Sequence, residues 1–345
     1  MVSNIIALLQ DLVNIDTTRN NKNEIAAARY LNGFFNHNKV ANTYFEPFPG
    51  RGSIVAGIPG ESKESILLLS HLDTENENTS SGYSAARSVV TQDYVAGRGT
   101  LDCKGNVAVL AYILKKLKDQ NFRPKKTVLF AAVAGEEDGG EVGTKWLLEN
   151  TEVFDCVDMV LGEGGGYPVP FQDQWYFTLQ SGEMIMTQNE ENVSFMNEEQ
   201  KKILFESAFR QGFFHEKTLD YIGGLPFNKY KRRIPEQNFL NGLSTFLDEQ
   251  KGICQPWSER KLQHASVFQQ ELQKINPAYQ VMPFITPGYS DNRYFRSRGI
   301  ETWGFFPLHP QNRINGIHGK NEHITTESLQ LSYHCLIAII KRLAQ

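Results

Sequence analysis

The chain has 345 residues, of which 40% are hydrophobic and 21% are charged, and its formal net charge at pH 7 is -4. This is an ordinary globular composition, and the length is sufficient for two domains. The near-neutral charge excludes a general electrostatic affinity for nucleic acid or for an anionic membrane. The short basic cluster KYKRR, residues 229–233, is typical of a solvated surface.

The N-terminus and the cysteines indicate the cellular compartment of the protein. The first residues, MVSNIIALLQDLVNIDTT, lack the basic start and the cleavage site of a signal peptide, and their apolar residues recur at helical spacing. No apolar run approaches the ~20 residues that a membrane span needs. The cysteines form no C-x-x-C pair, so they predict neither a disulfide framework nor a thiolate metal site. We therefore expect a soluble, cytoplasmic protein.

The first part of the chain alternates helical patterns with buried apolar strands. Helical patterns over residues 2–13 and 24–35 precede an extended segment at SIVAGIPG and the continuous apolar run SILLLSHLDT. A helix is predicted over 104–120, followed by the strand TVLFAAVA, a further helix at GTKWLLEN and the strand of CVDMVLG. Strands that alternate with helices predict an open, mostly parallel α/β sheet with helices on both faces.

The character of the chain changes between residues 167 and 280. QWYFTLQSGEMIMTQ is compatible with one or two strands, whereas NEEQKKILFESAFRQGFF and SERKLQHASVFQQELQKI show helical patterns. The α/β pattern then returns in VMPFITPGYSDNRYF and GIETWGFFP, and a closing helix is predicted over 326–343. The simplest organisation is one catalytic α/β domain, 1–166 and 281–345, interrupted by a partly helical insertion, 167–280.

Ionisable residues cluster just after the predicted strands. Five carboxylates and a histidine share such positions: His71 and Asp73, Glu136 and Glu137, Glu163, and Asp102 in the glycine-flanked turn GRGTLDCKG. Because the carboxyl ends of parallel strands meet at one edge of a sheet, we expect these side chains to converge. So many carboxylates repel one another, and a multivalent cation is the simplest compensation.

The types of candidate ligand residue narrow the choice of metal ion. Imidazole and carboxylate ligands without thiolate favour Zn²⁺, with Mn²⁺ and Co²⁺ as alternatives. A two-metal site needs a second histidine and a bridging carboxylate, for which His318 and Asp102 are the candidates and His323 is a competitor. Asp73 can reach the other ring nitrogen of His71 and fix its tautomer. Of the adjacent glutamates, one can bind metal while the other acts as a base toward a metal-bound water.

Simpler interpretations exist for each of these residues alone. An Asp or Glu after a strand is most often a helix cap or a solvated turn residue. Isolated histidines are typical of surface or satisfied core positions: His37, His215, His264, His309 and His334. Other signatures fail, since HEKTL lacks the second histidine of H-E-x-x-H and GYSAA lacks the closing glycine of a nucleophile elbow. It is the whole set, in this order, that favours a metal site.

The sequence resembles the co-catalytic dizinc metallopeptidases and amidohydrolases, the family of carboxypeptidase G, aminoacylase, acetylornithine deacetylase and succinyl-diaminopimelate desuccinylase. The matching stretches are LLLSHLDT, GRGTLDCKGN, AGEEDGG, LGEGGG, GYSDNRYF and GIHGKNEHI. They cover about residues 1–165 and 281–345 in the family's order. The resemblance implies a zinc-exopeptidase-like catalytic domain that hydrolyses an amide bond.

The resemblance also implies a role for each residue of the metal site. His71 and Glu163 would hold one Zn²⁺ ion, and Glu137 and His318 the other. Asp102 would bridge the two ions.

Three further residues receive roles from the same resemblance. Asp73 would orient His71. Glu136 would be the general base, which takes a proton from the metal-bridging water and returns it to the leaving amine. Arg293 looks like the arginine of aminoacylase- and carboxypeptidase-like members, and a planar guanidinium near the metal pair suits a substrate carboxylate. A structural salt bridge is the alternative for Arg293.

The insertion is where the chain departs from the family pattern. Family members have a small α/β lid that dimerises and, from a G-H-x-x-x-P-like stretch, supplies a histidine that polarises the substrate carbonyl. Neither FFHEK nor LQHAS, the surroundings of His215 and His264, has this pattern. The resemblance therefore leaves open whether the chain forms a homodimer and which residue replaces that histidine.

The sequence predicts a zinc-dependent hydrolase of N-acyl amino acids or small peptides with a free carboxylate, of the metallocarboxypeptidase or aminoacylase type. One alternative is a biosynthetic deacylase of the acetylornithine or succinyl-diaminopimelate type. A second is a non-catalytic binding protein on the same fold, against which the intact Glu136 and ligand set argue. The preferred acyl group and side chain stay open, because those contacts lie partly in the insertion.

Overall fold

The computed structural model describes residues 1–76, 87–171, 174–184, 252–254, 259–286, 289–314, 316–319 and 321–345. The described strands are β1 (Ala41–Phe48), β2 (Arg51–Ile58), β3 (Ser65–His71), β4 (Val89–Val90), β5 (Tyr94–Ala96), β6 (Thr127–Val133), β7 (Val157–Gly162), β8 (Pro168–Phe171), β9 (Gln174–Met184), β10 (Gly252–Cys254), β11 (Tyr279–Thr286), β12 (Glu301–Gly304) and β13 (His323–Thr325). The described helices are α1 (Val2–Val13), α2 (Glu24–His37), α3 (Lys104–Asp119), the π-helix η1 (Glu141–Lys145), α4 (Trp146–Asn150), α9 (Glu259–Ile275), α10 (Asn292–Arg296) and α11 (Thr326–Leu343).

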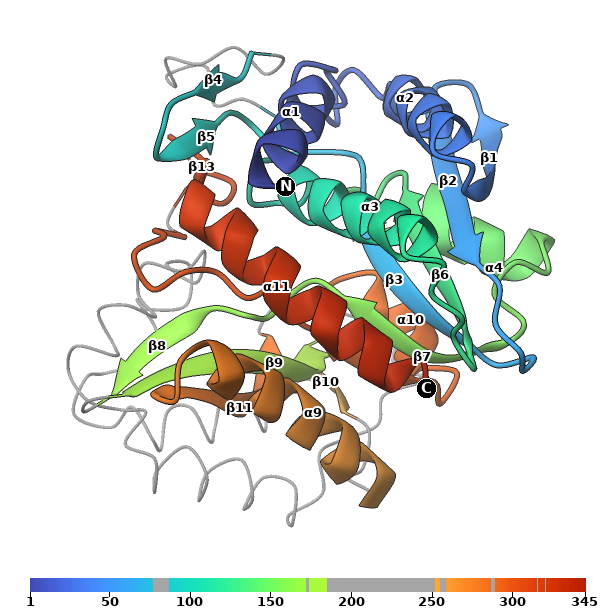
Figure 1. Ribbon diagram of the computed structural model, residues 1–345. Coiled ribbons are helices and arrows are strands. Elements are labelled where there is room, and N and C mark those ends of the chain that lie inside the picture. Colours follow the sequence, from blue (N-terminus) through green and yellow to red (C-terminus); the bar gives the residue numbers. More distant parts are fainter. Residues whose placement is uncertain are drawn as a thin grey trace.

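In the described part of the chain, ten strands form a central sheet in the order β1-β2-β6-β3-β7-β12-β9-β10, with β8 and β11 paired to β9 (Figure 1). Its middle strands β6, β3, β7 and β12 are parallel to one another. The antiparallel hairpin of β1 and β2 extends one side, and β9 meets β12 in the antiparallel sense on the other. The predicted open, mostly parallel sheet is confirmed.

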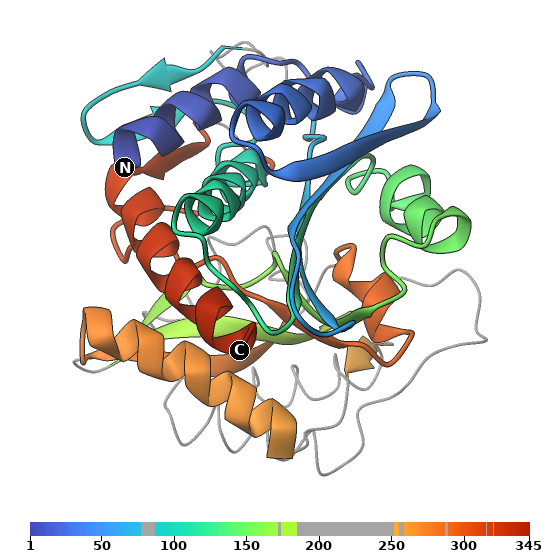
Figure 2. The same ribbon diagram turned by 45° about the vertical axis from the view of Figure 1, so that its right-hand side comes forward.

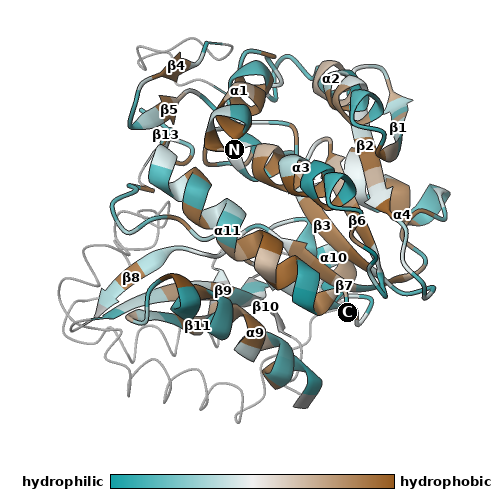
Figure 3. Cartoon of the chain, viewed as in Figure 1, coloured by the Kyte–Doolittle hydropathy of each residue, from teal (hydrophilic) through white to brown (hydrophobic). Residues whose placement is uncertain are grey.

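Helices cover both faces of this sheet, as predicted. Along β3, Ile66 and Leu68 pack into a core shared with α1, α2, α3 and α11, whereas Leu67 and Leu69 pack on the opposite face with residues of α4 and α10. Successive side chains of a strand point to opposite faces, so a strand buried on both sides reads as a continuous apolar run. Figure 2 shows α4 and α10 across the sheet from α1 and α3, and Figure 3 shows the apolar residues of β3, β6 and α3.

Several predicted element boundaries hold in the structure. The helices α1 and α11 begin and end where the sequence pattern placed them, and α3 ends one residue earlier than predicted. The helix predicted at GTKWLLEN consists of η1 followed by α4. It starts after Gly140, whose φ of 72° is in the left-handed region that glycine adopts without a Cβ penalty.

The predicted insertion contributes strands to the same sheet. QWYFTLQSGEM forms the single strand β9, which pairs in parallel with β11. The strand β11 crosses the predicted boundary at residue 280, and the predicted helix in SERKLQHASVFQQELQKI is α9, which packs on β11 and α11. The helical pattern NEEQKKILFESAFRQGFF lies outside the described residues. The division into catalytic domain and insertion therefore stays a prediction.

The described helices include none with the length and apolar character needed to cross a membrane.

Candidate metal centre

The predicted site residues follow three neighbouring parallel strands. His71 is the last residue of β3, the Glu136–Glu137 pair follows β6 after a short turn, and Glu163 follows β7 directly. Because β6, β3 and β7 are adjacent and parallel, their carboxyl ends meet at one edge of the sheet. Asp102 reaches the same edge from the turn that precedes α3.

Asp102 lies between two imidazoles that come from distant parts of the chain. Its Oδ1 is 3.0 Å from His71 Nε2, and its Oδ2 is 2.9 Å from His318 Nε2. Each imidazole also faces a second carboxylate, Glu163 Oε2 at 3.6 Å from His71 Nε2 and Glu137 Oε2 at 3.2 Å from His318 Nε2. The structure thus brings all five predicted ligands together in two groups that share Asp102.

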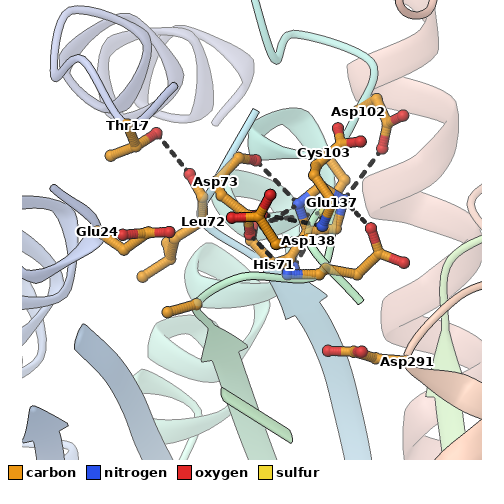
Figure 4. Close-up of polar contacts among 12 residues, drawn as sticks. Thr17, Glu24, His71, Leu72, Asp73, Asp102, Cys103, Glu137, Asp138 and Asp291 are labelled. Carbon is orange, nitrogen blue, oxygen red and sulfur yellow. Dashed lines mark hydrogen bonds and ion pairs between the residues drawn. The ribbon is translucent and has the colours of Figure 1, made fainter. Parts of the chain in front are cut away.

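The orientation of His71 depends on both the main chain and the side chain of Asp73. His71 Nδ1 donates to the Asp73 carbonyl oxygen at 2.9 Å, while the Asp73 carboxylate lies farther away, with Oδ1 at 3.6 Å. The carboxylate instead accepts hydrogen bonds from the backbone N–H groups of Glu136, at 3.1 Å, and Glu137, at 2.9 Å. Figure 4 shows Asp73 beside His71. Asp73 therefore fixes the main chain of the glutamate pair as well as the imidazole.

The turn that carries the glutamate pair is held at both ends. Gly135 has a φ of 74°, and its carbonyl accepts from the N–H of Gly140 at 2.6 Å, which closes the turn. Asp138 accepts from Arg19 Nε at 2.8 Å and from Arg51 Nη1 at 3.2 Å. These contacts occupy Asp138 and leave the two glutamate side chains for the site.

Burial and neighbouring carboxylates raise the pKa of the glutamates of this cluster, whereas hydrogen bonds with His318 and His71 lower the pKa of Asp102. Burial and then the charge of Glu163 raise the pKa of Glu136, while burial and the charge of Asp102 raise the pKa of Glu137 to about 7. Burial alone would lower the pKa of His318, but hydrogen bonds with Asp102 and Glu137 raise it to about 11. Protons on the imidazoles thus offset the negative charge, and a metal ion would take over that role as it displaces them.

The donor set fits a metal ion. Nitrogen and oxygen atoms of His71, Asp102 and Glu137 lie within 4.8 Å of one another, and so do those of Glu137, His318 and Glu75. Glu137 Oε1 is buried and has no hydrogen-bond partner among the described residues, as expected of a ligand atom. Imidazole and carboxylate donors of this kind suit Zn²⁺, Mn²⁺ or Co²⁺.

Two other histidines lie apart from this group. His323, the competitor for the ligand role, directs Nδ1 to the Asn321 carbonyl at 2.8 Å and packs its ring near Tyr94. His264 lies on α9, with Nδ1 2.8 Å from Glu301 Oε1 at the beginning of β12. That is the end of the strand opposite to the ligand-bearing edge. The structure therefore brings His318, and neither of these two, to Asp102.

Arg293 lies next to the glutamate turn. Its Nη2 donates to the Gly139 carbonyl at 2.6 Å, and its guanidinium lies 4.2 Å from the ring centroid of Tyr289 and 4.8 Å from that of Tyr294. Within the described ranges no carboxylate is within ion-pair distance of Arg293. The salt bridge considered as its alternative role is thus not found in this part of the chain.

Three residues next to the candidate ligands were not predicted from the sequence. Cys103 Sγ accepts from the backbone N–H of His71 at 3.1 Å, and burial raises the pKa of this thiol. Arg98 and Glu322 form a buried ion pair beside Asp102 and His318. The available signal was their position, because all three lie inside GRGTLDCKGN or GIHGKNEHI.

The sequence of residues 67–342 matches Peptidase family M20/M25/M40. The chain belongs to this family. The resemblance inferred from the motifs is thereby confirmed, and the match spans both the strand-end residues and the segment that contains His318.

Two curated relatives of this M20 member match it over about half of its length. A protein named probable succinyl-diaminopimelate desuccinylase from Staphylococcus aureus is 31% identical over 163 residues, 47% of this chain and 39% of that protein. N-formyl-4-amino-5-aminomethyl-2-methylpyrimidine deformylase from Halalkalibacterium halodurans is 29% identical over 174 residues, 47% of this chain and 40% of that protein. The matched segment thus spans about two fifths of the length of these relatives.

Solved structures of M20-type peptidases share the fold over the whole chain. An M20 family metallo-carboxypeptidase from Sulfolobus solfataricus has a TM-score of 0.66 at 14% identity and covers 98% of this chain and 97% of its own. Human carnosine dipeptidase 1 has a TM-score of 0.63 at 10% identity, with 100% of both chains covered. A Staphylococcus aureus tripeptidase has a TM-score of 0.62 at 16% identity, covering 100% of this chain and 99% of its own. At such identities the likeness establishes the fold alone.

Proposed function

We propose that this M20 member is a metal-dependent hydrolase that cleaves the amide bond of an N-acyl amino acid or a small peptide with a free carboxylate. The observation that carries this proposal is the placement of Asp102 between His71 and His318, with the buried side chains of Glu136 and Glu137 beside them. Membership in a peptidase family and the hydrolase names of the relatives support the same reaction class.

In this proposal the ligands hold two Zn²⁺ ions. One ion would be bound by His71 and Glu163, the other by Glu137 and His318, and Asp102 would be shared. When bound, such ions act as Lewis acids and lower the pKa of water, which supplies a nucleophile near neutral pH.

Glu136 is the group in the site best suited to carry a proton. It is 7% exposed, its Oε2 lies 4.0 Å from His71 Nε2, and burial together with Glu163 raises its pKa. A carboxylate with a raised pKa can accept a proton from water and hold it until it is needed. As the water oxygen adds to the carbonyl carbon and the C–N bond breaks, Glu136 delivers this proton to the amine nitrogen. Asp73 keeps the Glu136 main chain in place.

Arg293 would bind the substrate carboxylate. Its side chain is fixed by the Gly139 carbonyl and by stacking against Tyr289 and Tyr294. In the described part of the chain, the hydrogen bonds of this guanidinium use Nη2 alone, so Nε and Nη1 can donate to a carboxylate. Each of these two groups can give a substrate carboxylate a charge-assisted hydrogen bond, and the stacked guanidinium is already held in place for it.

A deacylase is the second candidate function. The Staphylococcus aureus relative is named a desuccinylase, and the Halalkalibacterium halodurans relative a deformylase. Both reactions cleave the same type of bond and differ in the acyl group released. The substrate, and not the metal site, therefore separates the two proposals.

The experiment is a hydrolysis panel with metal analysis. Purified protein is loaded with Zn²⁺ and incubated with dipeptides, with N-acyl derivatives of ordinary amino acids and with N-acetyl and N-succinyl diamino acids, and the released amine is quantified. Preference for peptides or simple acyl amino acids supports the exopeptidase-like proposal, and preference for succinyl or acetyl diamino acids supports the deacylase. Zinc-loaded protein that turns over no member of the panel would instead indicate a binding protein.

A further inference from the structure

A buried ion pair joins the segment that carries Asp102 to the segment that carries His318. Arg98 Nη1 lies 2.9 Å from Glu322 Oε2, and the side chains are 6% and 2% exposed. The two residues are 224 positions apart in the sequence. Arg98 precedes the turn of Asp102, and Glu322 follows the segment of His318 in the chain.

The Glu322 carboxylate fixes the main chain of the Asp102 turn. Its Oε1 accepts from the backbone N–H groups of Leu101 at 2.8 Å and Asp102 at 3.1 Å, and its Oε2 accepts from Gly99 at 2.9 Å. With Arg98 as a further donor, both oxygens have two hydrogen-bond donors each. Hydrogen bonds to a buried carboxylate are charge-assisted and stronger than neutral ones, so this turn is held firmly.

Arg98 fixes the other segment. Its Nη2 donates at 2.7 Å to the carbonyl oxygen of Gly319, the residue next to His318. His318 has a φ of 53°, in a left-handed region that residues other than glycine adopt infrequently. A conformation of this kind persists when the surroundings determine it, and the hydrogen bond from Arg98 to the next peptide is such a restraint.

We propose that the Arg98–Glu322 pair positions Asp102 and His318 relative to each other and so sets the affinity of the metal position that these two ligands share. The inference rests on the ligand roles given to Asp102 and His318 in the proposed function. Both members of the pair are positioning residues, because their side chains contact the main chain beside the ligands and not the ligand side chains.

The distribution of the contacts separates this role from general stabilisation. A buried ion pair by itself is weak evidence for stability, since desolvation of the charges offsets their attraction. Here the contacts of both side chains go to the pair itself and to the two ligand-bearing segments, as the hydrogen bonds to Asp102 and Gly319 show. Because His318 would belong to one metal position and Asp102 to both, we expect loss of the pair to weaken the position of His318 more than the other.

The test compares Glu322→Gln with the matched control Glu271→Gln. The Glu271 side chain is likewise buried, at 4% exposed, and pairs with an arginine, Arg342 at 2.6 Å, but it joins α9 to α11 away from the candidate ligands. Zn²⁺ stoichiometry and affinity are measured by competition with a chromophoric chelator. We expect two bound ions in the wild type and in Glu271→Gln. In Glu322→Gln we expect one of the two affinities to fall by about 10- to 100-fold, the range seen when groups that orient metal ligands are lost.

A second variant and a rescue complete the test. Arg98→Lys keeps the positive charge opposite Glu322, but one ammonium group cannot also hold the Gly319 carbonyl. This variant too should therefore bind one of the two Zn²⁺ ions more weakly. It provides the same measurement if Glu322→Gln does not fold. Activity of the variants should recover at high Zn²⁺ concentration, which a loss of folded protein would not produce.

The outcomes distinguish the two levels of the proposal. Two ions bound to Glu322→Gln and to Arg98→Lys with wild-type affinities would overturn the positioning role and leave the proposed function intact. An equal loss of affinity for both Zn²⁺ ions, in these variants and in Glu271→Gln, would likewise overturn the positioning role, because such a result indicates a general loss of stability. Wild-type protein that binds no Zn²⁺ would overturn the metal centre itself and this inference with it.

Discussion

Replacement of Asp73 by asparagine tests how the glutamate turn is held. The Asp73 side chain is fully buried and accepts from the backbone N–H groups of Glu136 and Glu137. Asparagine offers one oxygen in place of two, so its amide group would face one of these N–H donors. The variant therefore loses one charge-assisted hydrogen bond, weakens the other and leaves a buried donor unpaired.

The expected change in the free energy of unfolding follows from these contacts. A hydrogen bond to a charged group contributes about 1.5–3 kcal/mol, and an unpaired buried donor costs about 1–3 kcal/mol. Burial and then the charge of Asp73 raise the pKa of Glu24 to about 7, which shows that the two carboxylates repel each other. Removal of the Asp73 charge relieves this repulsion and so offsets part of the lost stability. We expect Asp73→Asn to lower the free energy of unfolding by about 2–4 kcal/mol. Displacement of Glu136 should also lower kcat by roughly 100-fold.

The assay is urea unfolding of metal-free protein, so that metal binding does not enter the comparison. Asp119→Asn is the control, since Asp119 is 39% exposed and pairs with Lys115 on the surface of α3. It should stay within about 0.5 kcal/mol of the wild type. If Asp73→Asn also stays within that range, the two backbone hydrogen bonds do not hold the turn and the reasoning is refuted.

Three further predictions concern the site and its metal. Glu136→Gln should lower kcat by about 10²- to 10⁴-fold with unchanged metal content by elemental analysis; wild-type kcat would exclude Glu136 as the proton carrier. Arg293→Lys should raise KM for a free-carboxylate substrate by roughly 10-fold, since an ammonium group lacks the fixed, stacked N–H donors of the guanidinium, and should leave KM for the corresponding amide nearly unchanged. Equal effects on the two substrates would contradict carboxylate binding. Addition of Zn²⁺ to metal-free protein should stabilise it by about 2.7 kcal/mol at a free concentration of 100 times Kd. A Tm that does not change with Zn²⁺ concentration in a thermal scan would argue against a metal centre in the folded state.

Much of the fold and part of the site could be predicted from local patterns. SILLLSHLDT was expected to be a buried strand, and it forms β3, which ends at the candidate ligand His71. The same holds for β6 before Glu136 and for β7 before Glu163. These predictions succeeded because a strand buried on both faces has a continuous apolar run, and parallel neighbours end at one edge.

The roles of neighbouring polar groups were harder to predict. The spacing of His71 and Asp73 suggested that the carboxylate orients the imidazole, yet the closer contact is with the Asp73 carbonyl, and the carboxylate also binds the glutamate turn. Which acceptor a side chain meets depends on how the turn after β6 folds back, and sequence spacing does not contain that information. The extension of the sheet by β9 and β11 was missed for a similar reason, since strand pairing across an insertion is a long-range property.

The sequence by itself determined the types of the candidate ligand residues, their order along the chain and the edge of the sheet at which they gather, because these follow from residue chemistry and the periodicity of buried strands. The tertiary structure decided that Asp102 meets His71 with one oxygen and His318 with the other. It also decided that Arg98 and Glu322 join the segments carrying Asp102 and His318. Contacts between residues so far apart in the chain depend on how the C-terminal segment returns to pack against the first half, which only the folded molecule specifies.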